Sequence, residues 1–219
     1  MLFRSGKLAE ATDGFSGADV AAIANTAVSF VIHEHLDKYS MATALGVRYS
    51  EGLYKNPFIG RTFIMPGQKA RKKSLRYKLT PQTTEIAGKK VMIVDDSIVR
   101  GNTSREIVRM LKDFGATEVY FAVACPPVQS PCFYGVDMPT RAELIANKKT
   151  VNEIKQHLDV DLLLYQKIDD LAEAVMRKGD HHIDRPCMAC FDKHYITSDM
   201  NREKIRLLEK MRINDRNGK

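Results

Sequence analysis

The sequence has few of the features that mark specialised protein classes. Its 219 residues include no tryptophan and four cysteines, the first of which is Cys125. No apolar run approaches the roughly 20 residues of a membrane span, and residues 1–7 lack the apolar core of a secretory signal. The chain therefore does not read as a membrane protein or a secreted disulfide scaffold, and we expect a cytoplasmic location.

The remaining composition is that of an ordinary globular protein with excess positive charge. Hydrophobic residues make up 44% and charged residues 28%, enough for one α/β core with appendages. Part of the net charge of +7 lies in a basic stretch at residues 69–78. No nucleic-acid-binding motif accompanies it, so no nucleic-acid partner is predicted, and no membrane partner either. A phosphate-rich small substrate, or a simply solvated loop, explains these lysines and arginines.

One central stretch carries the chemistry. Residues 91–94 are four consecutive apolar residues, typical of a strand buried on both faces. Two acids, Asp95 and Asp96, follow directly, and then a small polar loop to residue 104. One helical face comes next, formed by Ile107, Val108, Leu111 and Phe114, with Gly115 at the C-cap. The loop is thus predicted at the carboxyl end of a strand, where open α/β sheets bind ligands.

The residue types in this stretch suit a phosphorylated sugar. Carboxylates accept hydrogen bonds from vicinal hydroxyls and can hold Mg²⁺. A small polar loop at a helix N-terminus binds phosphate through its N–H groups and hydroxyls. An ordinary β–α turn with a solvated acidic pair is the plainer interpretation, but the order of acids, hydroxyls and glycine favours a ligand site.

The stretch resembles the phosphoribosyl pyrophosphate (PRPP) motif of type I phosphoribosyltransferases, in the version of the amidophosphoribosyltransferase family. The matching residues are Asp95, Asp96, Ser97, Ile98, Val99, Arg100, Gly101, Asn102, Thr103 and Ser104. Blocks at 55–64, 132–141 and 143–146 agree, and the resemblance runs from about 43 to 195. Alternating strands and helices independently predict an α/β fold with a parallel sheet. The resemblance makes it an incomplete sheet of the type I phosphoribosyltransferase kind, beside an N-terminal helix and a helical C-terminal tail.

The resemblance implies a glycosyltransferase that forms 5-phosphoribosylamine from PRPP in de novo purine synthesis. Asp95 and Asp96 would hold the ribose hydroxyls and Mg²⁺, residues 97–104 would bind the 5-phosphate, and a loop within 57–79 would close over PRPP. No catalytic residue is assigned, and the intact family enzyme is expected to be a homo-oligomer. A catalytically inert nucleotide-binding or regulatory module with the same fold is the alternative.

Residues 1–40 look unlike the rest. A capping box at Ser16 and Asp19 precedes an apolar helical face formed by Val20, Ile23, Ala24, Ala27, Val28 and Val31. Residues 12–31 resemble a lid helix of AAA+ ATPases, but no Walker A loop accompanies them, so ATP hydrolysis is excluded. An adaptor derived from such a lid is a third hypothesis. The family's glutaminase domain and pyrophosphate loop have no counterpart before residue 43, so we expect an open sheet edge.

Three units are therefore expected: a helical segment at 1–40, a partial phosphoribosyltransferase-like domain at 41–180, and a cysteine-bearing helical tail at 181–219. The resemblance aligns Cys132, Cys187 and Cys190 with ligands of a 4Fe–4S cluster. Clusters usually take four thiolates, and the family's fourth cysteine is missing here. An incomplete cluster and three reduced cysteines are equally compatible with the sequence.

Overall fold

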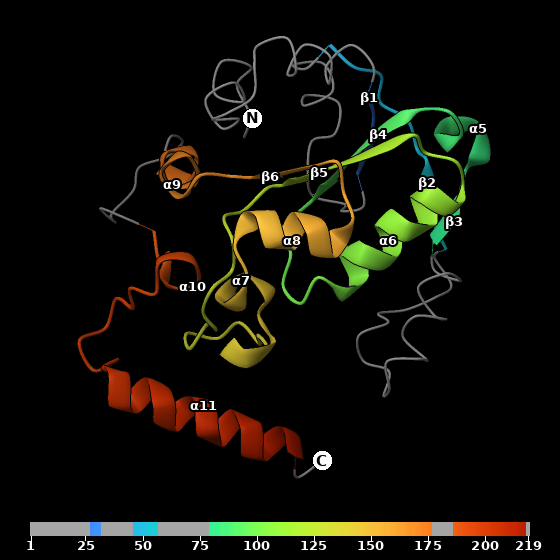
Figure 1. Cartoon of the computed structure of the whole chain (residues 1–219). Coiled ribbons are helices and arrows are strands. Elements are labelled where there is room, and N and C mark those ends of the chain that lie inside the picture. The colour runs from blue at the N-terminus through green and yellow to red at the C-terminus, as the bar shows by residue number, and fades with distance from the viewer. Residues whose placement is uncertain (1–26, 32–45, 57–78, 177–185, 218–219) are drawn as a thin grey trace.

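The computed structural model describes residues 27–31, 46–56, 79–176 and 186–217 (Figure 1). Its centre is a four-stranded parallel sheet in the order β1-β4-β5-β6. The strands are β1 (Ala27–Val31), β4 (Lys90–Asp95), β5 (Glu118–Val123) and β6 (Leu162–Tyr165). A separate antiparallel pair joins β2 (Leu53–Lys55) and β3 (Leu79–Pro81). The predicted α/β fold with a parallel sheet is confirmed.

Helices connect the strands of the sheet. Successive strands β4, β5 and β6 are neighbours, and the crossovers between them place α6 (Asn102–Asp113) and α8 (Val151–Leu158) on the same face (Figure 1). The shorter helices before the tail are α5 (Thr83–Ile86), the 3₁₀ helix η2 (Arg141–Glu143) and α7 (Ile145–Lys148). Helix α9 (Ile168–Met176) follows β6. In the described ranges, no helix is both long and apolar enough to cross a membrane.

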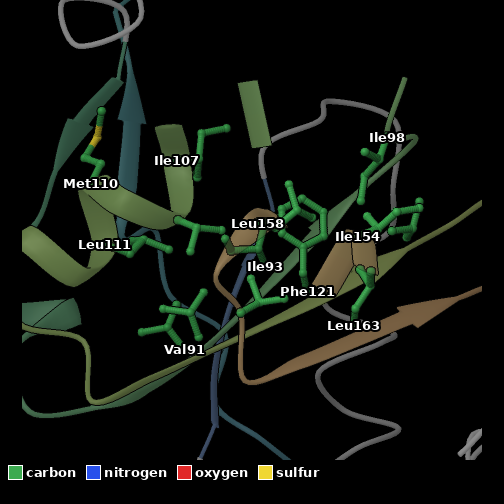
Figure 2. Packing of buried hydrophobic residues seen from close by; sticks show 14 of the residues in the cluster. Val91, Ile93, Ile98, Ile107, Met110, Leu111, Phe121, Ile154, Leu158 and Leu163 are labelled. Carbon is green, nitrogen blue, oxygen red and sulfur yellow. The ribbon is translucent and has the colours of Figure 1, made fainter. Parts of the chain in front are cut away.

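The core lies between the sheet and this helical face. All four residues at 91–94 are at most 2% exposed, as expected for a strand covered on both sides. Ile107, Val108 and Leu111 of α6 are buried against it, together with Phe121 of β5 (Figure 2). Phe114 was expected on the same face but is 39% exposed, because the helix has already ended at Asp113. Gly115 adopts a positive φ of 90°, as the predicted C-terminal glycine requires.

The N-terminal segment differs from the prediction. Residues 27–31 form a strand, paired in parallel with β4 from Ala27 opposite Lys90 to Val31 opposite Val94. The prediction of a helical face that continues to Val31 is therefore wrong for residues 27–31. Their apolar, partly β-branched sequence is compatible with either period, and the edge of β4 offers backbone partners that decide between them. Strand β1 is the outermost described strand on this side of the sheet, and the open sheet edge stays a prediction. Residues 1–26 and 32–45, with the rest of the predicted helical segment, lie outside the described residues.

The C-terminal tail packs on the loop after β5. It contains α10 (Ala189–Asp192) and α11 (Arg202–Asn217), which lies below the body of the molecule in Figure 1. The Tyr195 hydroxyl donates to the Pro131 carbonyl at 2.7 Å, and Arg212 donates to the Cys132 carbonyl at 2.6 Å. Of the residues expected to pack from α11, Ile205 and Leu208 are half-buried but Leu207 is 58% exposed. The Tyr195 ring also packs against Phe133 and Tyr134, so the tail is attached through both polar and aromatic contacts.

Candidate functional site

The carboxyl ends of the parallel strands form one edge of the sheet. Asp95 at the end of β4 is in register with Val123 of β5, which is in register with Tyr165 of β6. Cys125 follows β5 at this edge, and burial raises the pKa of its thiol to about 12, with the nearby carboxylates of Asp96 and Asp95 adding to the rise. The predicted acidic pair therefore lies where an α/β sheet places its ligands.

The two acids are arranged by hydrogen bonds within their own turn. The Asp96 N–H donates to Asp95 Oδ1 at 3.0 Å, and the Ser97 hydroxyl donates to Asp96 Oδ1 at 2.9 Å. The Asp95 carbonyl accepts from the Ala124 N–H at 2.9 Å, which continues the β4–β5 pairing to the strand end. Asp95 is half-buried and Asp96 exposed, so this turn presents carboxylate oxygens and a hydroxyl near the surface.

The loop ends at the N-terminus of α6. Gly101 is the N-cap, in a left-handed conformation with φ 76°, and its carbonyl accepts the first helical hydrogen bond from the Arg105 N–H at 2.9 Å. No described side chain caps α6, and its first turn contains no acidic residue. A twelve-residue helix with this start favours an anion at its N-terminus. Phosphate binding by this loop stays a prediction, with which the start of α6 is compatible.

The loop residues themselves divide into two groups. Asn102 and Thr103 are exposed beside the acidic turn. Ile98 is 1% exposed and belongs to the hydrophobic core, so only its backbone can face a ligand. Ser104 is also buried. The structure thus brings the two acids and the start of α6 to one edge while turning other predicted side chains inward.

Arg100 is bound by a residue that the sequence did not place in the site. Its Nε and Nη2 donate to Oε1 of Glu143 at 3.0 and 2.7 Å. The second oxygen, Oε2, accepts from the N–H and the hydroxyl of Thr140, each at 2.9 Å. Burial pushes the pKa of Glu143 up, but the hydrogen bonds from Thr140 and Arg100 outweigh it and the pKa is lowered. The capping-box spacing of Thr140 and Glu143 was readable in the sequence, whereas the link to Arg100 was not.

Two further polar groups at the end of β6 also escaped the sequence reasoning. The hydroxyl of Tyr165 and Oε1 of Gln166 are buried and have no hydrogen-bond partner among the described residues. Burial, with Cys125 nearby, raises the pKa of Tyr165 above its ordinary value. The Gln166 N–H donates to the Val123 carbonyl at 3.0 Å, which fixes the backbone at this point. A tyrosine and a glutamine after an apolar strand carry no sequence signal for a site.

The oxygen donors at this edge fit a magnesium ion. Mg²⁺ usually binds through one or two carboxylates, with substrate phosphates and water completing its octahedron. Asp95 and Asp96 offer such carboxylates beside the anion-binding start of α6. The ion remains a prediction, to which the chemistry of these donors is suited.

The predicted iron–sulfur residues lie in one region without forming a ligand set. Burial raises the pKa of Cys190 to about 11, and the nearby thiols of Cys132 and Cys187 add to the rise. The Cys190 carbonyl accepts from the N–H groups of residues 129 and 130, and Tyr134 N–H donates to the Cys132 sulfur at 3.3 Å. In the part of the chain that is described, no three His, Cys, Asp or Glu side chains are placed to hold one metal. The residues present do not fit a four-thiolate cluster.

Comparison with known proteins identifies two family matches. A family model described as a phosphoribosyl transferase domain matches residues 41–162, and one described as an AAA+ lid domain matches residues 5–44. Both resemblances read from the sequence therefore recur in the comparison. The first covers more than half of the chain.

Curated relatives named amidophosphoribosyltransferase match over most of this chain. The protein of Pseudomonas aeruginosa is 46% identical over 172 residues, 78% of this chain and 34% of the relative. That of Bacillus subtilis is 46% identical over 156 residues (71% and 33%), and that of Escherichia coli is 42% identical over 175 residues (80% and 34%). The chain spans about a third of the length of these relatives.

Solved structures agree with this match. Glutamine PRPP amidotransferase from B. subtilis, complexed with ADP and GMP, has a TM-score of 0.66 at 39% identity, covering 82% of this chain and 42% of that one. A structure described as the allosteric regulatory enzyme of purine biosynthesis has the same TM-score at 38% identity, covering 84% and 42%.

Proposed function

The chain belongs to the phosphoribosyl transferase domain family, and from this premise we propose that residues 41–180 bind PRPP as the phosphoribosyltransferase part of an amidophosphoribosyltransferase. The observation that carries the proposal is one continuous unit along the chain. It consists of a buried strand, the acidic pair, the left-handed Gly101 and helix α6, whose N-terminus has no side-chain cap. The relatives named amidophosphoribosyltransferase, at 42–46% identity, support this function over the wider family's other reactions. The transferred group would be an amine, giving 5-phosphoribosylamine in purine synthesis.

The site suggests where each part of PRPP would bind. Asp95 and Asp96 accept hydrogen bonds from the ribose hydroxyls, and residues 97–104 with the N-terminus of α6 hold the 5-phosphate. Mg²⁺, held by the same two carboxylates and the ligand's oxygens, would neutralise the negative charge of the pyrophosphate. The basic segment 57–78, expected to cover PRPP, lies outside the described residues.

The reaction needs positioning more than covalent help from the protein. Ammonia attacks C1 of the ribose, the bond from C1 to the pyrophosphate oxygen breaks, and the electron pair leaves with pyrophosphate. The attacking nitrogen then loses a proton to solvent. The protein contributes by holding the sugar and its phosphate in place and by stabilising charge on the leaving group.

We extend the proposal to the organisation of the chain. Residues 1–40 would be an N-terminal segment that is related to AAA+ lids and contributes β1 to the sheet, and residues 181–219 would be a cysteine-bearing tail. A homo-oligomer would be the assembled form, as in the intact family enzyme. An iron–sulfur cluster on Cys132, Cys187 and Cys190 would be partial, because three thiolates stand where a cluster usually takes four.

Calorimetric titration with ribose 5-phosphate and Mg²⁺ tests the site. The double variant Asp95→Asn with Asp96→Asn, and Thr103→Ala, should each weaken binding by about tenfold or more, since hydrogen bonds to charged groups contribute about 1.5–3 kcal/mol. Matched controls remove the same groups elsewhere. Asp113→Asn with Asp159→Asn removes one carboxylate at the end of α6 and one at the end of α8, and Thr117→Ala removes an exposed hydroxyl before β5. Equal affinity in the site variants and controls would contradict the assignment.

A nucleotide-binding module without chemistry is the second candidate. It is favoured by one observation, that the matching B. subtilis structure was determined with ADP and GMP. A purine nucleoside monophosphate shares the ribose 5-phosphate group that the loop would recognise. Supplying PRPP, Mg²⁺ and ammonia and following pyrophosphate release separates the two. The binding module would bind GMP and release no pyrophosphate above the rate without protein, whereas the transferase would release it slowly but above that rate.

A further inference from the structure

We propose that Glu143 is a positioning residue that sets the shape of the ligand loop, residues 97–104, by holding Arg100. The role of that loop in ligand binding rests on the proposed function, whereas the link between the two residues is a feature of the fold. Glu143 lies in η2, 43 residues after Arg100, so the pair joins two distant segments. Arg100 is then a structural element of the loop, and phosphate binding falls to the start of α6.

The carboxylate of Glu143 is shared between the two segments. Oε1 accepts both hydrogen bonds from the Arg100 guanidinium, and Oε2 accepts both from Thr140. Four donors on one carboxylate hold its orientation, and charge-assisted bonds of this kind are about twice as strong as neutral ones. The side chains of Arg100 and Glu143 remain 37% and 39% exposed, so solvent moderates the strength of the pair. The contribution is therefore to geometry more than to global stability.

Two neighbouring contacts show that the same segments meet along several residues. The Ile145 N–H donates to the Val99 carbonyl at 3.0 Å. A Cβ on Gly101 would lie 2.8 Å from Cδ1 of Ile145. Residues 99, 100 and 101 of the loop are thus all placed against residues 143–145. Because two of these three contacts do not involve Glu143, its substitution should loosen the loop without unfolding the domain.

The charge balance distinguishes this role from direct phosphate binding by Arg100. The negative charge of Glu143 offsets the positive charge of Arg100 at 2.7 Å. If Arg100 were a phosphate ligand restrained by Glu143, removing the carboxylate would free the guanidinium and strengthen binding. If Glu143 positions the loop, the same substitution weakens binding. The two roles predict opposite signs.

The chain provides a matched control in a second capping box. Thr150 and Glu153 at the start of α8 repeat the arrangement of Thr140 and Glu143, with the Glu153 carboxylate accepting from the N–H and hydroxyl of Thr150 at 2.7 and 2.8 Å. Glu153→Gln therefore changes a capping box in the same way as Glu143→Gln, at a site that carries no arginine of the ligand loop.

The experiment combines amide hydrogen exchange of residues 97–104 in the ligand-free protein with calorimetric titration of ribose 5-phosphate. Glu143→Gln should speed exchange in the loop several-fold and weaken binding about three- to tenfold. Arg100→Gln should do the same, and the double variant should be no worse than either single one. Glu153→Gln should leave both quantities unchanged, and melting temperatures report any loss of folding.

Each alternative outcome has a definite meaning. Loop exchange that is equal in Glu143→Gln and Glu153→Gln overturns the positioning role. Faster exchange with unchanged affinity also overturns it, and tighter binding in Glu143→Gln would instead make Arg100 a phosphate ligand. If the unaltered protein binds no ribose 5-phosphate while Glu143→Gln still speeds loop exchange, the proposed function fails and the link to the loop stands.

Discussion

Gly101 offers a sharp test of the loop geometry, because two separable costs oppose any side chain there. Its φ of 76° is left-handed, which costs a residue with a Cβ about 1–2 kcal/mol. The added Cβ would also lie 2.8 Å from Cδ1 of Ile145, which is itself 6% exposed. Overpacking costs about 1–3 kcal/mol, and the lower end applies because Cδ1 is the tip of a side chain. Gly101→Ala should therefore lower the free energy of unfolding by about 2–3 kcal/mol.

Two further variants separate the costs. Gly88 has a similar φ of 73°, and a Cβ added there would have no atom within 4 Å, so Gly88→Ala should lose only the conformational part, about 1–2 kcal/mol. Ile145→Val removes the clashing Cδ1 and costs about 0.5–1.5 kcal/mol alone. Combined with Gly101→Ala it should cost about 1 kcal/mol less than the sum of the single changes.

Urea denaturation of the unaltered chain and the four variants measures these energies, and thermal melting should show Gly101→Ala about 4–12 °C below the unaltered chain. Ribose 5-phosphate titration of Gly101→Ala should show weaker binding, since the first turn of α6 must shift. Equal destabilisation by Gly101→Ala and Gly88→Ala, with strict additivity of Ile145→Val, would refute the proposed packing of the loop on α7.

Three other outcomes are expected. Val28→Pro with Ser29→Pro should remove backbone donors from β1 and speed amide exchange in β4. Size-exclusion chromatography should then show concentration-dependent association, because the edge of β4 is exposed. Unchanged exchange in β4 would contradict the pairing. Anaerobically purified protein should be brown weakly if at all, and Cys187→Ser should remove any colour, whereas a stoichiometric, air-stable 4Fe–4S spectrum would show that three thiolates suffice. Glutamine-dependent pyrophosphate release by this polypeptide should be nil, because none of its four cysteines lies before the predicted PRPP loop to serve as a glutaminase nucleophile. Ammonia-dependent release should be very low. Robust release with glutamine would overturn the expectation that this polypeptide has no glutaminase activity.

Much of the candidate site could be read from the sequence because it lies within one β–α unit. The apolar run at 91–94, the acids after it, Gly101 and the apolar spacing of α6 are neighbours along the chain. Such a unit needs no distant contacts. It is determined by the spacing of apolar residues, the backbone preferences of glycine and the residue types at a helix end. The Thr150–Glu153 capping box belongs to the same class, since its partners are three residues apart.

Other features depended on segments that only the folded chain brings together. The alignment of Asp95, Val123 and Tyr165 follows from strand register, which spacing along the chain does not specify. Residues 27–31 have an apolar pattern that suits a helix or a strand, and the backbone groups of β4 make the choice. Leu207 fits a packed helix face in sequence, yet its side chain is 58% exposed in the folded chain.

The pairing of Arg100 with Glu143 shows most directly why the sequence alone does not predict such contacts. Each residue has a local explanation, Arg100 in the candidate ligand loop and Glu143 in a capping box. Their attraction acts only when the crossover from β5 returns η2 beside the loop, and the free energy for that return comes from the buried core rather than from the ion pair. The residue types of the candidate site are therefore determined by neighbours along the chain. The contacts that orient their side chains depend on how the core packs.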